Sequence, residues 1–198
     1  MNNIENVVYR YSPEDQLAVR YHAIPSACTG SAEDLGAARS SYRSDLLELL
    51  QVDRHDLPPV LEHLEAVVDG TWVRTRVGAV HRDHCADRMF LQTLLASGSA
   101  QDAVRAEVAL ATERGLEPVV VIVEPSDTVG SVLDQMAPRD TFVVAYSDVE
   151  ATVGWTVICG PEVEGRQDIQ APPGTELHDM PVWNFVRRYG AASDRHAA

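Results

Sequence analysis

Residues 119–146, VVVIVEPSDTVGSVLDQMAPRDTFVVAY, contain the pattern that decides the fold class. Residues 119–123 form an uninterrupted apolar run, which is typical of a strand that is buried on both faces of a sheet. Ser126 and Asp127 then precede apolar side chains at helical spacing, and residues 141–146 form a second apolar strand. A strand, a helix and a strand in this order predict two parallel strands joined by a right-handed crossover.

Residues 153–159 (VGWTVIC) predict one more strand of the same sheet. Only residues 147–152 separate this strand from the one before it, so we expect the two to be antiparallel. Residues 101–114 and 182–189 have the apolar spacing of helices. The C-terminal half of the chain is therefore predicted to hold the sheet together with two flanking helices.

The N-terminal half is predicted to be rich in helix. A Ser-Pro-Glu-Asp start at residues 12–15 predicts a helix that continues to residue 24. Residues 35–49 and 56–68 place apolar side chains at the 3.6-residue period of an amphipathic helix. Residues 4–11 are rich in β-branched and aromatic side chains and predict a short strand.

Residues 71–77 (TWVRTRV) alternate with a period of two, which places Trp72, Arg74 and Arg76 on one side of a strand. This alternation predicts a half-exposed strand near the edge of the sheet. An edge strand can pair with another chain, so a homodimer formed through these residues, or through an exposed helix face, is one arrangement open to the protein.

These elements together predict the α/β (or α+β) fold class. We expect a single domain over residues 1–189, with a helix-rich N-terminal half and a mixed sheet of about four or five strands. The β-α-β unit lies at residues 118–147. Residues 190–198 are small and polar, and we expect them to form a flexible C-terminal tail.

The composition excludes several classes of function. The 198 residues include 30 acidic and 16 basic side chains, and all of the basic ones are arginine. The absence of lysine excludes a lysine Schiff base and a phosphate-binding P-loop. The formal net charge of −14 argues against general binding to nucleic acid or to an anionic membrane. We expect a cytoplasmic protein, because no signal-peptide pattern is visible and three widely spaced cysteines do not suit a disulfide framework.

The densest group of candidate metal ligands is the segment HRDHCADR at residues 81–88. If the segment is helical, His81, His84 and Cys85 share one face, and Asp87 lies three residues beyond the second histidine. Imidazole and thiolate ligands at this spacing suit a divalent transition metal such as zinc or iron, or an acid–base pair. The alternative is a strand-to-helix junction whose polar side chains have only a capping role.

Glu124 and Asp148 follow the two expected parallel strands. Ligands of open α/β sheets bind beyond the carboxyl ends of such strands. The two carboxylates are therefore predicted to approach one another as an acid–base pair or as ligands of a divalent cation. Capping of the helix that follows by Ser126 and Asp127 is the alternative explanation for the polar residues at this edge.

Cys28 lies just before the long helix expected at residues 35–49. A helix N-terminus stabilises a thiolate, so this position suits a nucleophile, with His81 as the base and Asp83 or Asp87 as the orienting acid. A buried cysteine with a packing role is the alternative.

Three functions follow from these features. The first is a small cytoplasmic enzyme that acts on a small-molecule substrate by acid–base chemistry, with or without a metal, using residues 81–87, Glu124 and Asp148. The second is an acidic, non-catalytic binding protein, such as an immunity protein, an antitoxin or a regulatory partner of a basic protein. The third is a hydrolase or acyltransferase that depends on Cys28.

Overall fold

The computed structural model describes residues 4–11, 18–68, 70–76, 101–123, 127–148, 151–165, 176–189 and 191–192. These residues divide into two compact units. The first unit contains the described residues up to Val67 together with residues 74–76, and the second contains residues 68 and 70–73 and all described residues from Gln101 onward. A compact unit is not by itself a domain, so the single domain expected over residues 1–189 stays a prediction.

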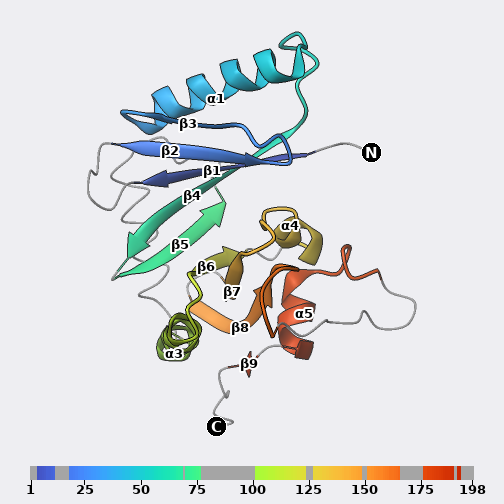
Figure 1. Cartoon of the computed structure of the whole chain (residues 1–198). Coiled ribbons are helices and arrows are strands. Elements are labelled where there is room, and N and C mark those ends of the chain that lie inside the picture. Colours follow the sequence, from blue (N-terminus) through green and yellow to red (C-terminus); the bar gives the residue numbers. More distant parts are fainter. Residues whose placement is uncertain are drawn as a thin grey trace. The chain divides into compact units, whose positions relative to one another are not determined.

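The first unit is a sheet with one long helix (Figure 1). The strand order is β3-β2-β1-β4-β5, with β1 antiparallel to β2 and parallel to β4. The boundary between the units falls at the end of β4, after Val67, and in the middle of β5, between Val73 and Arg74. The elements are β1 (Glu5–Tyr11), β2 (Val19–Ile24), β3 (Thr29–Ala32), α1 (Leu35–Leu50), β4 (Val60–Val68) and β5 (Thr71–Arg76).

The prediction of a helix-rich N-terminal half is wrong. Residues 19–24 and 60–68 are strands, and α1 is the single helix among the described residues up to position 76. In β2 the buried side chains Val19, Tyr21 and Ala23 recur at a period of two, which is the period of a strand. Pairing with β1 therefore decides the conformation of both segments, and the helical spacing of their apolar residues does not.

The long helix expected at residues 35–49 is confirmed as α1. It begins after Asp34, whose side chain accepts a hydrogen bond from the Ala37 N–H at 2.7 Å. One face packs on β2 and β3, and the Tyr42 ring meets Tyr21 edge to face at 5.9 Å. The buried residues of that face are Leu35, Ala38, Tyr42 and Leu46, whereas the expected stripe also included Leu49, which is 53% exposed.

The second unit contains the predicted β-α-β arrangement. Strands β6 and β7 are parallel, and β7 and β8 are antiparallel, as the sequence predicts. The strand order is β6-β7-β8-β9. The elements are α3 (Gln101–Glu113), β6 (Pro118–Val123), α4 (Val129–Leu133), β7 (Thr141–Asp148), β8 (Ala151–Cys159), α5 (Val182–Tyr189) and β9 (Ala191–Ala192). The mixed α/β class is confirmed, but four or five strands are too few, because the described residues contain nine.

Every residue of β6 is buried, which explains its continuous apolar sequence. Alternate side chains of β6 join a core that also receives residues from α4, β7, β8 and α5, while α3 contacts β6 and β7 (Figure 1). The crossover helix α4 has only five residues and is capped by Thr128, not by Ser126 or Asp127. The largest side chains in this core are Phe142, Phe185, Ile158 and Met180.

Within the described ranges, no helix is both long enough and apolar enough to cross a membrane. Of the expected C-terminal tail, Ala191–Ala192 form β9 on the edge of β8, and the other residues after Tyr189 lie outside the described residues.

Gly160, the residue after β8, lies directly against the backbone of residues 137 and 138. A Cβ atom there would lie 2.4 Å from the Pro138 carbonyl oxygen and 2.7 Å from that of Ala137, so backbone would have to move. We expect Gly160→Ala to lower the free energy of unfolding by about 1–3 kcal/mol, measured by urea denaturation. The control is Gly36→Ala on the exposed side of α1, which should stay within about 1 kcal/mol of the wild type because alanine favours helix. Equal effects of the two changes would contradict this packing.

Candidate functional site

The strands of the first unit have two faces of different chemistry. Strand register and alternation place one set of side chains on the face opposite α1, because Arg10 pairs with both Arg20 and Glu65, and Val8 pairs with both His22 and His63. We call this set the arginine face. Its charged and imidazole side chains are Arg10, Arg20, His22, His63, Glu65, Arg74 and Arg76.

Glu65 is the centre of the arginine face. Its side chain is fully buried and accepts hydrogen bonds from two arginines on neighbouring strands. The Nε of Arg74 donates to Oε2 at 2.7 Å, and the Nε of Arg10 donates to Oε1. Arg74 is itself only 2% exposed, so the half-exposed strand expected at residues 71–77 is wrong at this position. One carboxylate thus holds two guanidinium groups in fixed positions.

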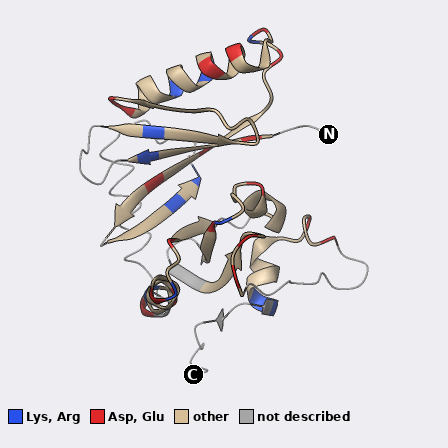
Figure 2. Ribbon diagram, viewed as in Figure 1, with Lys and Arg blue, Asp and Glu red and all other residues tan. Residues whose placement is uncertain are grey.

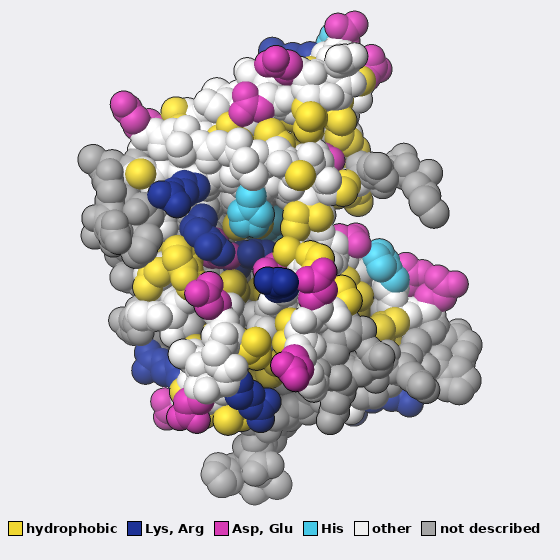
Figure 3. Space-filling model, in the orientation of Figure 1, with side chains coloured by type: hydrophobic (Ala, Val, Ile, Leu, Met, Phe, Trp, Pro, Cys, Tyr) yellow, Lys and Arg dark blue, Asp and Glu magenta, His cyan; other side chains and the backbone are white. Residues whose placement is uncertain are grey.

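Among the side chains of β1 to β5, the arginine face has more positive than negative charge. Glu65 is its one carboxylate among the residues of β1 to β5, because Glu5 and Glu62 lie at the alternate positions that face α1. Two further arginines, Arg20 and Arg76, add to the two that contact Glu65. Figure 2 shows basic positions on β1, β2 and β5, and Figure 3 shows basic side chains and a histidine close together on the visible surface.

His63 is a buried imidazole on the arginine face. It is 3% exposed, and its pKa is lowered from 6.5 to about 3 by burial first and then by Arg74, Arg76 and His22. The imidazole is therefore neutral over the physiological pH range. Its Nε2 lies 3.3 Å from the Oδ1 of Asn6, a neighbour on the same face. With a pKa this low, His63 is suited to hydrogen bonding and not to proton transfer near pH 7.

The face toward α1 uses its charged side chains in contacts with the helix instead. Arg39 of α1 forms a two-point pair with Glu62 of β4, with Nη2–Oε2 and Nε–Oε1 distances of 2.6 and 3.1 Å. The Tyr9 hydroxyl also donates to Glu62 at 3.1 Å, and Tyr21 donates to Asp45 of α1. These contacts attach the helix to the strands, and they give this face a structural role.

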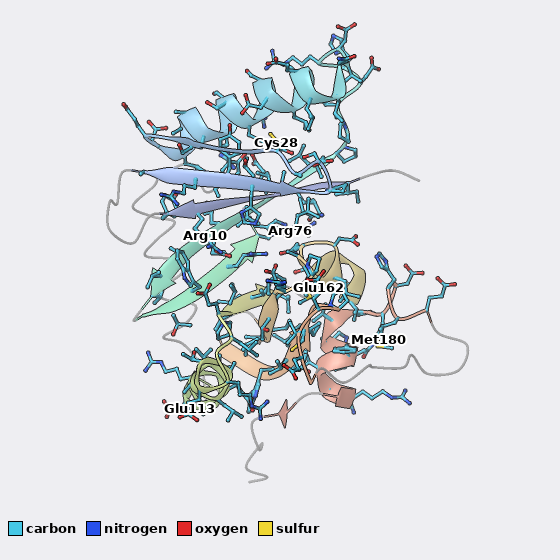
Figure 4. The ribbon with its side chains drawn as sticks, in the orientation of Figure 1. Arg10, Cys28, Arg76, Glu113, Glu162 and Met180 are labelled. Atoms are coloured by element: carbon cyan, nitrogen blue, oxygen red, sulfur yellow. The ribbon has the colours of Figure 1, made fainter. Side chains whose placement is uncertain are left out.

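Cys28 lies on the α1 side of the strands, while Arg10 and Arg76 lie on the other side (Figure 4). It is separated from the start of α1 by β3, and Asp34 caps the helix. Burial raises the pKa of the Cys28 thiol, and the charges of Asp45 and Glu5 raise it further. These surroundings favour the thiol over the thiolate, so they give no support to a Cys28 nucleophile.

The other predicted site residues are not brought together by the described structure. His81, His84, Cys85, Asp87 and Glu124 lie outside the described residues. Asp148 is the last residue of β7 and is in register with Ala151 of β8. A search of the described residues alone finds no group of three potential metal ligands. The metal site and the carboxylate pair therefore stay predictions.

The sequence analysis missed the arginine face as a site. It did place Arg74 and Arg76 on one side of a strand, but it assigned Arg20, His22 and His63 to helices. The available signal was the alternation of residues 19–24 (VRYHAI), in which polar side chains occupy every second position.

Comparisons of the chain with protein families, with curated proteins and with solved structures find no match. The function must therefore be inferred from the geometry of the described residues.

Removing the Glu65 charge tests its role in holding the face together. Glu65→Gln leaves the buried Arg74 guanidinium without its counter-charge, so we expect the free energy of unfolding to fall by about 3–5 kcal/mol. Combining Glu65→Gln with Arg74→Met should cost less than the two single changes added together, because neither buried charge is then left alone. Chemical denaturation measures both effects. A loss below about 1 kcal/mol for Glu65→Gln would contradict the role given to this carboxylate.

The low pKa of His63 predicts a pH-dependent stability with a definite sign. Unfolding restores the ordinary pKa of 6.5, so the unfolded chain binds a proton that the folded protein excludes until about pH 3. The contribution is complete above pH 6.5 and is lost as the pH falls through this window, by about 2 kcal/mol between pH 7 and pH 5. His63→Gln should shrink the difference in stability between these two pH values by that amount.

Proposed function

We propose that this protein binds a small anionic molecule on the arginine face. The observation that carries the proposal is the presence of four arginines on one strand face, two of them in contact with Glu65, in a chain where acidic residues outnumber basic ones by 30 to 16. Charges of one sign repel each other, so their collection on one face of a sheet has an electrostatic cost. A bound anion offsets that cost.

The chemical class of the ligand follows from the side chains. A guanidinium group presents a planar set of N–H donors that matches the oxygens of a phosphate or a carboxylate. Arg20 is exposed, and Arg10, His22 and Arg76 are half-buried, so the face has groups within reach of solvent. The buried carboxylate of Glu65 fixes the position of one of these groups, the Arg10 guanidinium.

The net charge of the whole chain favours a small anion over a polyanion. At −14 the protein repels a long nucleic acid, whose binding depends on many phosphate contacts over an extended basic surface. A ligand of a few atoms meets only the local positive potential of the arginine face. The neutral state of His63 further favours binding over acid–base catalysis, so we propose recognition and not a reaction.

The small-molecule partner that the sequence predicts remains part of this proposal. The role of an acidic partner for a basic protein is not favoured on this face, whose charge has the opposite sign. The cytoplasm remains our proposed location, supported by the cysteine pattern; Cys28 and Cys159, two of the three cysteines, are free.

Titration of the ¹⁵N-labelled protein with inorganic phosphate and with succinate, followed by NMR, tests the proposal. We expect shifts in the amides of β1, β2 and β5, and a three- to tenfold weaker affinity for Arg20→Gln because a charged donor is lost. Arg20→Lys should bind with intermediate affinity. The control Arg139→Gln, at an exposed arginine of the second unit that pairs with Glu162, should bind as the wild type does.

Two results would overturn the proposal. One is an affinity for both anions that is equal in the wild type and in Arg20→Gln. The other is binding of a 20-nucleotide single-stranded DNA more tightly than phosphate at 150 mM salt, which would make the face a nucleic-acid surface instead.

A further inference from the structure

A second candidate site lies at α1, away from the arginine face. A pocket of about 530 Å³ is formed by one side of the helix and by the segment that follows it. Its volume falls within the range of about 300–1,000 Å³ that is usual for small-molecule sites. The lining residues are Ser40, Arg43, Ser44 and Leu47 from α1, and Arg54 and Leu57 from the following segment.

The lining residues of α1 form their own stripe on the helix. Positions 40, 43, 44 and 47 are spaced by three and four residues, which places them on one side of the helix. The residues that pack on the strands, at positions 35, 38, 42 and 46, form a different stripe. The pocket side of α1 is therefore not used to hold the helix on the sheet.

The chain turns back sharply to complete the pocket. Gln51, the residue after the helix, has a left-handed conformation with φ of 52°, which reverses the direction of the chain. A turn follows in which the Asp56 N–H donates to the Asp53 carbonyl at 2.9 Å. This turn carries Arg54 and is followed by Leu57, and both side chains line the pocket while Asp53 and Asp56 do not.

The charged side chains that line the pocket are all basic. Two guanidinium groups line it and no carboxylate does. In the part of the chain that the structure describes, neither Arg43 nor Arg54 has an ion pair. The Ser40 hydroxyl donates to the Gly36 carbonyl at 3.0 Å, while Ser44 lies one residue from Arg43. The pocket thus offers donors for an anionic group, with two leucine side chains beside them.

We propose that this pocket binds an amphipathic anion, a phosphate or carboxylate attached to a short apolar chain. The charged end lies between Arg43 and Arg54, whose donors match two or more oxygen atoms. The apolar chain lies against Leu47 and Leu57, both half-buried, and removes their surfaces from water. This site shares no residue with the arginine face, so each can fail without the other.

Three probes separate the two halves of this ligand. Hexyl phosphate has both the head and the chain, inorganic phosphate has the head alone, and hexanol has the chain alone. We expect hexyl phosphate to bind at least tenfold more tightly than either of the others, with NMR shifts concentrated in residues 40–57. Leu57→Ser should remove most of the advantage of hexyl phosphate over inorganic phosphate.

Charge variants then test the head group. Arg43→Gln with Arg54→Gln should weaken hexyl phosphate at least tenfold, and Arg54→Gln alone provides the test if the double variant does not fold. Arg20→Gln, on the arginine face, and Arg139→Gln should leave this affinity unchanged. The proposal is overturned if the arginine variants bind hexyl phosphate as the wild type does, if the shifts fall outside residues 40–57, or if hexyl phosphate binds no more tightly than inorganic phosphate.

Discussion

The arginine face depends on the contact of the Glu65 carboxylate with Arg10 and Arg74. It joins three strands of the first unit, because the three residues come from β4, β1 and β5. A buried guanidinium group is strongly unfavourable without a counter-charge, and Glu65 supplies that charge as the one carboxylate that β1 to β5 place on this face. On the opposite face, Glu62 pairs with Arg39 and attaches α1. The same kind of interaction thus has a structural role on one face and leaves excess positive charge on the other.

The fold could be predicted from the sequence where the residue pattern of a segment is compatible with only one secondary structure and one degree of burial. The continuous apolar run of β6 requires burial on both faces, so the parallel pair with β7 followed from the sequence. β4 shows why the rest could not be predicted. Its apolar residues fit a helical period, and its polar residues His63 and Glu65 are buried, which breaks the alternation of an ordinary strand. Pairing with β1, which is more than 50 positions earlier in the chain, decides the conformation.

The candidate site could be predicted even less, because it arises from strand register. Arg20 is more than 40 residues from Glu65 and Arg74, and the three share one face only because β2, β1, β4 and β5 are neighbours in that register. A local cluster such as residues 81–88 attracts attention in a sequence, whereas a cluster assembled from alternate positions of four strands does not. The charge on one strand face could be inferred only after the strands themselves were assigned correctly.

The most direct test of this account is the titration of the His63 imidazole by two-dimensional ¹H–¹⁵N NMR between pH 8 and pH 4. The resonance is assigned with His63→Gln. Burial beside Arg74 and Arg76 predicts that His63 stays neutral throughout this range, since its pKa is lowered to about 3. A titration of His63 with an ordinary pKa near 6.5 would show that the imidazole is not buried beside Arg74 and Arg76, and the account of this face would be wrong.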